Sequence, residues 1–155
     1  MKKTVSDSLT EQVHIITQAD LNGYSRLFGG KLMEWIDIVA GVTARRHSGK
    51  NITTAMVDSL KFKNAAHAND MLVIIGKVTY VGKTSMEICV KTYVEISDGM
   101  RHLINTAFFV MVALDENEKP TDVPELVLVT EQEKMEWEFA RLRNLARKNR
   151  KMGEF

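Results

Sequence analysis

Three apolar runs joined by two short glycine turns constrain the fold of this chain more than any other feature. The runs cover residues 70–82, 84–96 and 101–114, and the turns between them are "VGKT" and "SDGM". Within the second run, Met86, Ile88 and Val90 alternate with Glu87 and Lys91, as in a strand with one apolar face. Such short turns join antiparallel neighbours, and glycine supplies the turn conformation. The pattern therefore predicts an antiparallel sheet.

The sequence before these runs adds one long helix and two further strands. Residues 29–47 carry apolar side chains at three- and four-residue spacing, which indicates a helix that ends near Gly49. Its apolar face contains Phe28, Leu32, Trp35, Ile36, Val39 and Thr43. Residues 11–17 and 52–63 are typical of strands, and 101–114 is apolar enough to be covered on both faces. This order predicts an α+β fold in which a curved antiparallel sheet wraps one helix.

Two prolines, Pro120 and Pro124, mark the one clear linker in the chain. The linker divides a body, residues 1–120, from a C-terminal segment, residues 121–155, that contains a basic helix over 130–151. "TEQE" is a capping box with Thr130 as the N-cap residue. An apolar stripe follows at Met135, Phe139, Leu142 and Ala146. The helix has three open roles: it covers a sheet, adds to an oligomer interface, or brings its basic end to a nucleotide or an acidic partner.

Composition excludes several classes of protein. The chain has 155 residues, which suits one domain with a real core, and its formal net charge of +1 favours neither nucleic acid nor a membrane surface. Because Cys89 is the single cysteine, an intrachain disulfide framework and a cysteine zinc site are excluded, and a reducing compartment fits. The N-terminus lacks the apolar stretch of a signal peptide. We therefore expect a cytoplasmic protein.

The start of the long helix is the most informative point for chemistry. Gly29 and Gly30 stand where free backbone N–H groups form a partial positive charge, and glycine lets another group approach closely. Such a start suits an anion or a carbonyl oxygen that gains negative charge. The alternative is a tight turn packed against another backbone.

Asp37 lies on the same side of this helix as Gly30 and Gly41. The small residues suggest close approach of another element, such as a second copy of the helix. A carboxylate beside an N-terminal oxyanion site is a candidate general base or nucleophile. The alternative is a solvated aspartate on a polar flank.

Other catalytic signatures are weak or absent. The sequence has no G-x-S-x-G elbow, Walker A motif or dinucleotide fingerprint, and its four histidines lack metal-ligand spacing. "GKTS" at 82–85 fits a hairpin turn, although its lysine and hydroxyls are also suited to hold a phosphate.

Together these residues resemble the acyl-CoA thioesterases of the hotdog fold. The resemblance covers residues 10–120 and rests on "LFGGKLMEWID", "TTAMVDSLKF", "VGKTSM" and "FFVMVALDENEKP". It implies a hotdog fold, a long central helix wrapped by a curved antiparallel sheet, with the C-terminal helix added. It also implies dimers with a continuous sheet, active sites at the dimer interface, and assembly into hexamers as trimers of dimers.

The resemblance assigns roles to particular residues. The catalytic aspartate of the family falls on Asp37, and Asn22 falls on an asparagine expected to face the aspartate of the other subunit. A backbone N–H at Gly29 or Gly30 is the expected oxyanion donor, and Thr54 lies near the active site. The residues implicated in contact with the coenzyme A moiety are Gly82, Lys83, Thr84 and Ser85. Many relatives have glycine where this chain has Ser25, so its Asn22 loop is expected to sit differently.

The implied reaction is hydrolysis of acyl-CoA to free coenzyme A and a carboxylic acid. Coenzyme A enters only as part of substrate and product, and no metal or other cofactor is expected. Asp37 either activates a water or attacks the carbonyl directly, and the sequence does not distinguish these two roles. An alternative is a non-catalytic acyl-CoA sensor on the same fold, which would not need both Asn22 and Asp37. A hotdog dehydratase ranks last, because His47 lies at the wrong end of the helix. The acyl chain length stays open.

Overall fold

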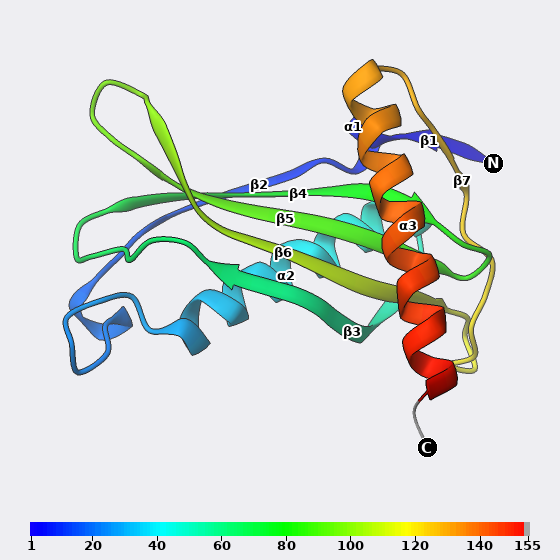
Figure 1. Ribbon diagram of the computed structural model, residues 1–155, viewed down its shortest axis with the longest axis horizontal. Coiled ribbons are helices and arrows are strands. Elements are labelled where there is room, and N and C mark those ends of the chain that lie inside the picture. The colour runs from blue at the N-terminus through cyan, green and yellow to red at the C-terminus, as the bar shows by residue number, and fades with distance from the viewer. Residues whose placement is uncertain (154–155) are drawn as a thin grey trace.

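A five-stranded antiparallel sheet curves around the long helix α2, and a second long helix, α3, lies across the other face of the sheet (Figure 1). The computed structural model describes residues 1–153. The elements in chain order are β1 (Lys2–Thr4), α1 (Val5–Ser8), β2 (Thr10–Ile15), the 3₁₀ turn η1 (Gln18–Asp20), α2 (Gly29–Ser48), β3 (Asn51–Phe62), β4 (Met71–Val81), β5 (Ser85–Glu95), β6 (Arg101–Leu114), β7 (Glu125–Val127) and α3 (Glu131–Gly153).

The sheet has the strand order β2-β4-β5-β6-β3, and every neighbouring pair is antiparallel. The predicted hairpins are confirmed: β4 and β5 pair from Met71 opposite Glu95 to Val81 opposite Met86, and β5 continues into β6. β2 is shorter than expected and ends at Ile15, because Asp20 caps the backbone N–H of Thr17 and starts η1 there. β3 is an edge strand, so one side of its backbone has no partner within the described chain.

The core fills the space between α2 and the sheet. Leu32, Trp35, Ile36, Val39 and Thr43 are buried as predicted. They pack against strand residues that include Ile74, Ile88, Phe109 and Met111. Phe28 departs from the prediction: it precedes the helix in an extended conformation, and 55% of it is exposed. The apolar spacing therefore predicted the buried face of the helix correctly. It started that face at Phe28, one turn before Leu32, its first buried member.

The segment after β6 adds structure that the sequence did not indicate. β7, inside the predicted linker, pairs in parallel with β1, and β1 leads directly into the short helix α1. His47 at the end of α2 contacts the same segment, since its Nε2 lies 2.8 Å from the backbone oxygen of Pro124. The N-terminus, the end of α2 and residues 121–127 therefore meet at one end of the sheet.

Helix α3 packs on the outer face of the sheet by its polar side. Ala140 is fully buried, Lys77 Nζ lies 2.7 Å from both carboxylate oxygens of Glu136, and the rings of Tyr80 and Trp137 are 5.4 Å apart. Its predicted stripe of Met135, Phe139, Leu142 and Ala146 is exposed. The capping prediction is confirmed in part, because Thr130 accepts a hydrogen bond from the Glu133 N–H, but the Glu133 carboxylate returns to Val129 instead. Of the three open roles, α3 thus fills that of covering the sheet.

Candidate active site

Helix α2 and the edge strand β3 lie side by side, and three contacts follow their shared boundary. A Cβ placed on Gly29 would lie 3.8 Å from the ring of Phe62, and one placed on Gly41 would lie 3.6 Å from Ile52. Between these points Thr54 reaches Asp37. We call this boundary the α2–β3 seam. It brings the helix start, Asp37 and Thr54 to one surface of the molecule.

Asp37 and Thr54 form the central interaction of the α2–β3 seam. The hydroxyl Oγ1 of Thr54 lies 3.0 Å from Oδ1 of Asp37 and 3.3 Å from the sulfur of Met111. A hydroxyl has one hydrogen, and a carboxylate is the stronger acceptor, so Thr54 donates to Asp37. The second carboxylate oxygen has no hydrogen-bond partner among the described residues, and Asp37 is exposed. The pair is thus an oriented carboxylate that a substrate or water can reach.

The start of α2 leaves its first N–H groups uncapped. No side chain caps Phe28, and the first turn contains no acid. The helix bonding begins with Lys31 and Leu32, whose N–H groups donate to the Phe28 oxygen. Among residues 1–153 no acceptor bonds the N–H of Gly29 or Gly30. The predicted bare helix start is therefore present.

Gly30 also has a packing reason, whereas a Cβ on Gly29 would make only an ordinary contact. A Cβ on Gly30 would lie only 2.8 Å from the ring of Phe28, which folds back over the first turn. Phe62 approaches Gly29 from β3. Both phenylalanine rings are about half exposed, so they form an apolar rim around the uncapped N–H groups.

Asp37 does not stand beside this helix start within one chain. Eight residues separate it from Gly29, and at 1.5 Å of rise per residue this is about 12 Å along the helix axis. An oxyanion donor must lie about 3 Å from the reacting carbonyl oxygen, and the base must reach the carbonyl carbon directly or through one water. The predicted meeting of this carboxylate with the oxyanion donors therefore needs a helix start other than the one on its own helix.

The loop before α2 shows what Ser25 and Asn22 do. Asn22 Oδ1 accepts hydrogen bonds from the Tyr24 and Arg26 N–H groups at 2.9 Å and 3.3 Å, so its side chain holds the turn. Ser25 has a φ of 59°, the left-handed conformation that favours glycine. The loop therefore adopts a glycine-like turn even with serine there. Asn22 and Gly29 line a cavity of about 390 Å³ together with Phe62.

The turn at 82–85 lies at the opposite end of the sheet from the Asn22 loop (Figure 1). It is a tight hairpin in which the Gly82 N–H donates to the Ser85 oxygen at 2.9 Å. The oxygens of Lys83 and Thr84 accept from Val123 and Ala113. In the described chain no hydrogen bond joins this turn to Asn22, Asp37 or Thr54. The structure therefore does not bring the two groups of predicted site residues together within one protomer.

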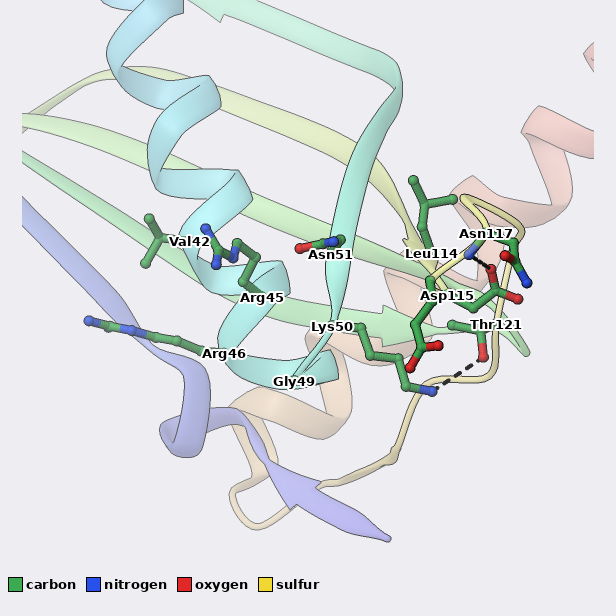
Figure 2. Close-up of a pocket in the computed structure, with 11 residues that line it drawn as sticks. Val42, Arg45, Arg46, Gly49, Lys50, Asn51, Leu114, Asp115, Asn117 and Thr121 are labelled. Carbon is green, nitrogen blue, oxygen red and sulfur yellow. Dashed lines mark hydrogen bonds between the residues drawn. The ribbon is translucent and has the colours of Figure 1, made fainter.

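A cavity of about 870 Å³ lies between the end of α2 and the turn after β6 (Figure 2). Its charged lining residues are Arg45, Arg46, Lys50, Asp115 and Glu116. Several are already engaged: Lys50 Nζ donates to Thr121 Oγ1 and to the Asp122 oxygen, and Arg46 donates to the Leu9 oxygen. This cavity includes none of the predicted site residues, and no sequence motif indicated it.

The histidines and the cysteine lie outside the α2–β3 seam. Burial lowers the pKa of His47, and its hydrogen bond with Pro124 opposes this in part. Burial raises the pKa of the Cys89 thiol to about 11, so it is a poor nucleophile.

No group of three or more His, Cys, Asp or Glu side chains within residues 1–153 is placed to hold a metal ion. Over the same residues, no helix combines the length and apolarity needed to cross a membrane.

Comparison with known proteins places this chain in a family. A model described as the thioesterase superfamily matches residues 24–98. A relative from Bacillus subtilis (strain 168), an uncharacterized acyl-CoA thioester hydrolase, is 43% identical over 85% of this chain and 77% of the relative. The chain belongs to the acyl-CoA thioester hydrolases of the thioesterase superfamily. The cytosolic acyl coenzyme A thioester hydrolase of Rattus norvegicus is 35% identical over 97% of this chain, which spans only 40% of that longer protein.

Solved structures confirm the predicted hotdog fold. The acyl-CoA hydrolase from Staphylococcus aureus, in complex with butyryl coenzyme A, coenzyme A and coenzyme A disulfide, superposes with a TM-score of 0.94. It is 30% identical, and the match covers 99% of this chain and 94% of that one. An apo-hexameric acyl-CoA thioesterase superposes with a TM-score of 0.92 at 38% identity, over 96% of each chain.

The Staphylococcus aureus enzyme has also been solved with single residues replaced by alanine. The replaced residues are an asparagine, an aspartate and a threonine. The asparagine precedes the aspartate by 15 positions, and the aspartate precedes the threonine by 17. The same intervals separate Asn22, Asp37 and Thr54 in this chain.

Proposed function

We propose that this protein hydrolyses acyl-CoA thioesters to free coenzyme A and a carboxylic acid, with the reaction carried by residues 1–120. The hydrogen bond from Thr54 to the exposed carboxylate of Asp37 is the observation that carries this proposal. It orients one carboxylate oxygen and leaves the other open to a reacting group. The matching intervals in the Staphylococcus aureus enzyme support the choice of these residues and of Asn22.

The mechanism follows from what each group can do. A free N–H at Gly29 or Gly30 donates to the thioester oxygen and stabilises the negative charge that develops there. Asp37 takes a proton from water as the water oxygen bonds to the carbonyl carbon, or its own oxygen forms that bond first. In both routes the carbon–sulfur bond then breaks, and the thiolate of coenzyme A leaves and is protonated. In the second route the acyl group stays on Asp37 as an anhydride, which water hydrolyses to release the carboxylic acid and restore the Asp37 carboxylate. Thr54 holds the Asp37 carboxylate in position.

Two copies of the chain are needed to complete this site. The ~12 Å that the helix rise places between Asp37 and Gly29 excludes joint action within one protomer. The exposed apolar side chains of α2, β3 and the residue before α2 provide a surface for the second copy: Phe28, Met33, Ile38, Met56, Val57 and Phe62. The unpaired edge of β3 offers the hydrogen bonds that a continuous sheet needs.

We extend the proposal to the assembly and to the rest of the substrate. Dimers through β3 assemble further into a hexamer, which the apo-hexameric relative supports. Gly82, Lys83, Thr84 and Ser85 contact the coenzyme A moiety, with Lys83 exposed to meet a phosphate. Asn22 faces the Asp37 of the second copy. The reaction takes place in the cytoplasm and uses no metal or added cofactor.

Replacement of Asp37 tests the catalytic role. We expect Asp37→Asn to lower kcat for butyryl-CoA at least about a hundredfold, because loss of a base removes roughly 10²–10⁴ in rate. Glu34→Gln, at an exposed carboxylate one turn earlier on α2, is the matched control and should retain activity. A thiol reagent measures the released coenzyme A, and buried Cys89 should contribute no background. Unchanged turnover in Asp37→Asn refutes the role of Asp37, and tight acyl-CoA binding without thiol release in the native protein favours a sensor.

Subunit mixing tests the shared site. Asn22→Ala and Asp37→Asn homodimers should both be inactive, whereas unfolding and refolding them together creates mixed dimers. Each mixed dimer contains one site with both native residues, so random pairing restores about a quarter of the native activity by the geometry of a two-fold dimer. No recovery, with mixed dimers shown by mass spectrometry, contradicts a site shared between two copies.

A further inference from the structure

The strand that carries Thr54 is irregular where it passes the site. β3 pairs Thr54 with Met111 and Met56 with Val110, so Ala55 is an extra residue. A second irregularity follows between Val57 and Ser59, which leaves Asp58 as another extra residue opposite β6. Each bulge interrupts the ladder and bends the strand. The backbone from Thr54 to Ser59 is therefore held less completely by β6 than the rest of the strand.

A cluster of charges on the outer face of the sheet holds this irregular segment. Arg147 Nε donates to Asp58 at 2.8 Å, and Arg150 donates to the other carboxylate oxygen. Arg147 also reaches Glu87 on β5, which accepts a two-pronged contact from Arg143 at 2.7 Å and 3.0 Å. We call this cluster the α3 clasp: Asp58, Glu87, Arg143, Arg147 and Arg150.

Three members of the α3 clasp are largely withdrawn from water. The side chains of Asp58 and Arg147 are 9% and 8% exposed, and that of Glu87 is 1% exposed. Thr79 Oγ1 donates to Glu87 at 2.6 Å, which adds a further hydrogen bond to the buried carboxylate. Paired charges in such surroundings are costly to separate, because each would be left buried without compensation. The clasp therefore restrains Asp58 firmly.

Asp58 and Thr54 present their side chains to opposite faces of the sheet. Thr54 points inward to Asp37 on α2, whereas Asp58 points outward to α3. Three residues of the bulged segment, 55–57, connect Thr54 to Asp58. Fixing Asp58 on one face of the sheet therefore limits the movement of Thr54 on the other. The restraint acts through the face of the sheet, so pairing of the β3 edge with a second copy would leave it in place.

We propose that the α3 clasp is a positioning device for the active site. Arg147 and Arg150 bind Asp58 and thereby hold the bulged part of β3, so that the Thr54 hydroxyl meets the Asp37 carboxylate. The inference rests on the proposed function, in which Asp37 and Thr54 act on the thioester. It assigns the basic end of α3 a role in turnover, beyond covering the sheet, although that helix touches none of the proposed catalytic residues. Misplacement of a catalytic group by about 1 Å can cost 10²-fold in rate.

Arg150→Gln is the first test, because 55% of this side chain is exposed and its loss should not unfold the protein. We expect kcat for butyryl-CoA to fall about tenfold, within the range for a displaced catalytic group, with KM and the urea midpoint unchanged. Arg150→Lys should restore most of the activity. Arg141→Gln is the matched control, since Arg141 is an exposed arginine of α3 whose one ion-pair partner within residues 1–153 is Glu138 on its own helix. Equal kcat values for Arg150→Gln and Arg141→Gln overturn the inference.

A double-mutant cycle separates positioning from general weakening. If the α3 clasp acts through Thr54, Arg150→Gln should have no further effect on kcat in a Thr54→Val background. The same fractional loss in both backgrounds overturns the inference. If Asp37→Asn and Thr54→Val lower kcat while Arg150→Gln does not, only the positioning role fails. If Asp37→Asn and Thr54→Val keep native turnover, the proposed function fails and the inference falls with it.

Discussion

Helix α2 meets the inner face of the sheet through apolar side chains such as Ile36 and Val39, whereas α3 meets the outer face through Glu136, Arg143 and Arg147. Both helices have an apolar stripe in sequence, but only that of α2 is buried. Burial of each large aliphatic side chain contributes about 1.5–3 kcal/mol, while a buried ion pair has little net worth unless it is broken. The apolar contact therefore supplies stability, and the charged contact supplies a defined placement.

The largest expected effect comes from breaking the charged attachment. Glu87→Ala leaves Arg143 and Arg147 without their shared carboxylate in a buried site. Removing one partner of a buried pair costs about 3–5 kcal/mol, so we expect the free energy of unfolding to fall by that amount. Urea denaturation followed by circular dichroism measures it. Glu138→Ala, at an exposed carboxylate of α3, is the control and should leave the urea midpoint close to native. Equal losses in the two variants would contradict a buried charged attachment.

The apolar attachment is tested by Ile36→Ala on α2. Ile36 is fully buried against the sheet, so its truncation should lower the free energy of unfolding by about 2–5 kcal/mol. Leu145→Ala, at an aliphatic side chain of α3 that is 50% exposed and lies outside the surface proposed for the second copy, is the control, with a change within about 0.5 kcal/mol. The same urea titration measures both. A loss at Leu145 as large as that at Ile36 would contradict the assignment of the stability to the buried face of α2.

Acid should weaken the end of α2, through His47, at a higher pH than it weakens the α3 clasp. Burial holds the pKa of His47 below its usual 6.5, so the unfolded chain binds more protons than the folded chain between these two values. Stability therefore falls as pH drops below about 6.5. A protonated His47 would also carry a buried Nδ1–H, and Nδ1 has no hydrogen-bond partner among the described residues.

The α3 clasp should persist to a lower pH than the His47 contact. Burial raises the pKa of Asp58, but hydrogen bonds from Arg150 and Arg147 outweigh this and hold it below 3.8. Its contribution is present above that value and is lost as pH falls through the lower folded pKa. Urea midpoints from pH 7 to 5 should thus decline in the native protein and less steeply in His47→Gln. His102→Gln, at an exposed histidine, should keep the native slope. An unchanged slope in His47→Gln contradicts the assignment.

The smallest effect is expected on the outward stripe of α3. Leu142 is 48% exposed and lies on the side of the helix that faces away from the sheet. Leu142→Gln should change the free energy of unfolding by no more than about 0.5 kcal/mol, as for other surface positions. Ala140→Gln, at the buried point of contact, should cost more, because the larger side chain would force α3 from the sheet. A large loss in Leu142→Gln would show that the stripe is covered by another molecule in solution.

Much of the fold could be predicted because its signals are local. The alternation in 84–96 and the glycine turns that flank it specify two hairpins, and the structure has both. The apolar spacing from Leu32 to Thr43 identified the buried face of α2. Phe28 was misplaced because an apolar residue before a helix has the same spacing as one inside it. The roles of Asn22, Asp37 and Thr54 came from a family resemblance, and they stay a prediction until the variants are measured.

Sequence alone determined the order of the elements, the buried face of α2 and the uncapped start at Gly29, since each depends on residues a few positions apart. Only the tertiary structure decided which face of α3 meets the sheet. It showed that Glu87, 56 positions before Arg143, turns the polar side of that helix inward. It also decided that Thr54 reaches Asp37 across two elements, while Asp37 stays two turns from Gly29. Contacts between distant residues depend on the packing of whole elements, and a local pattern does not record them.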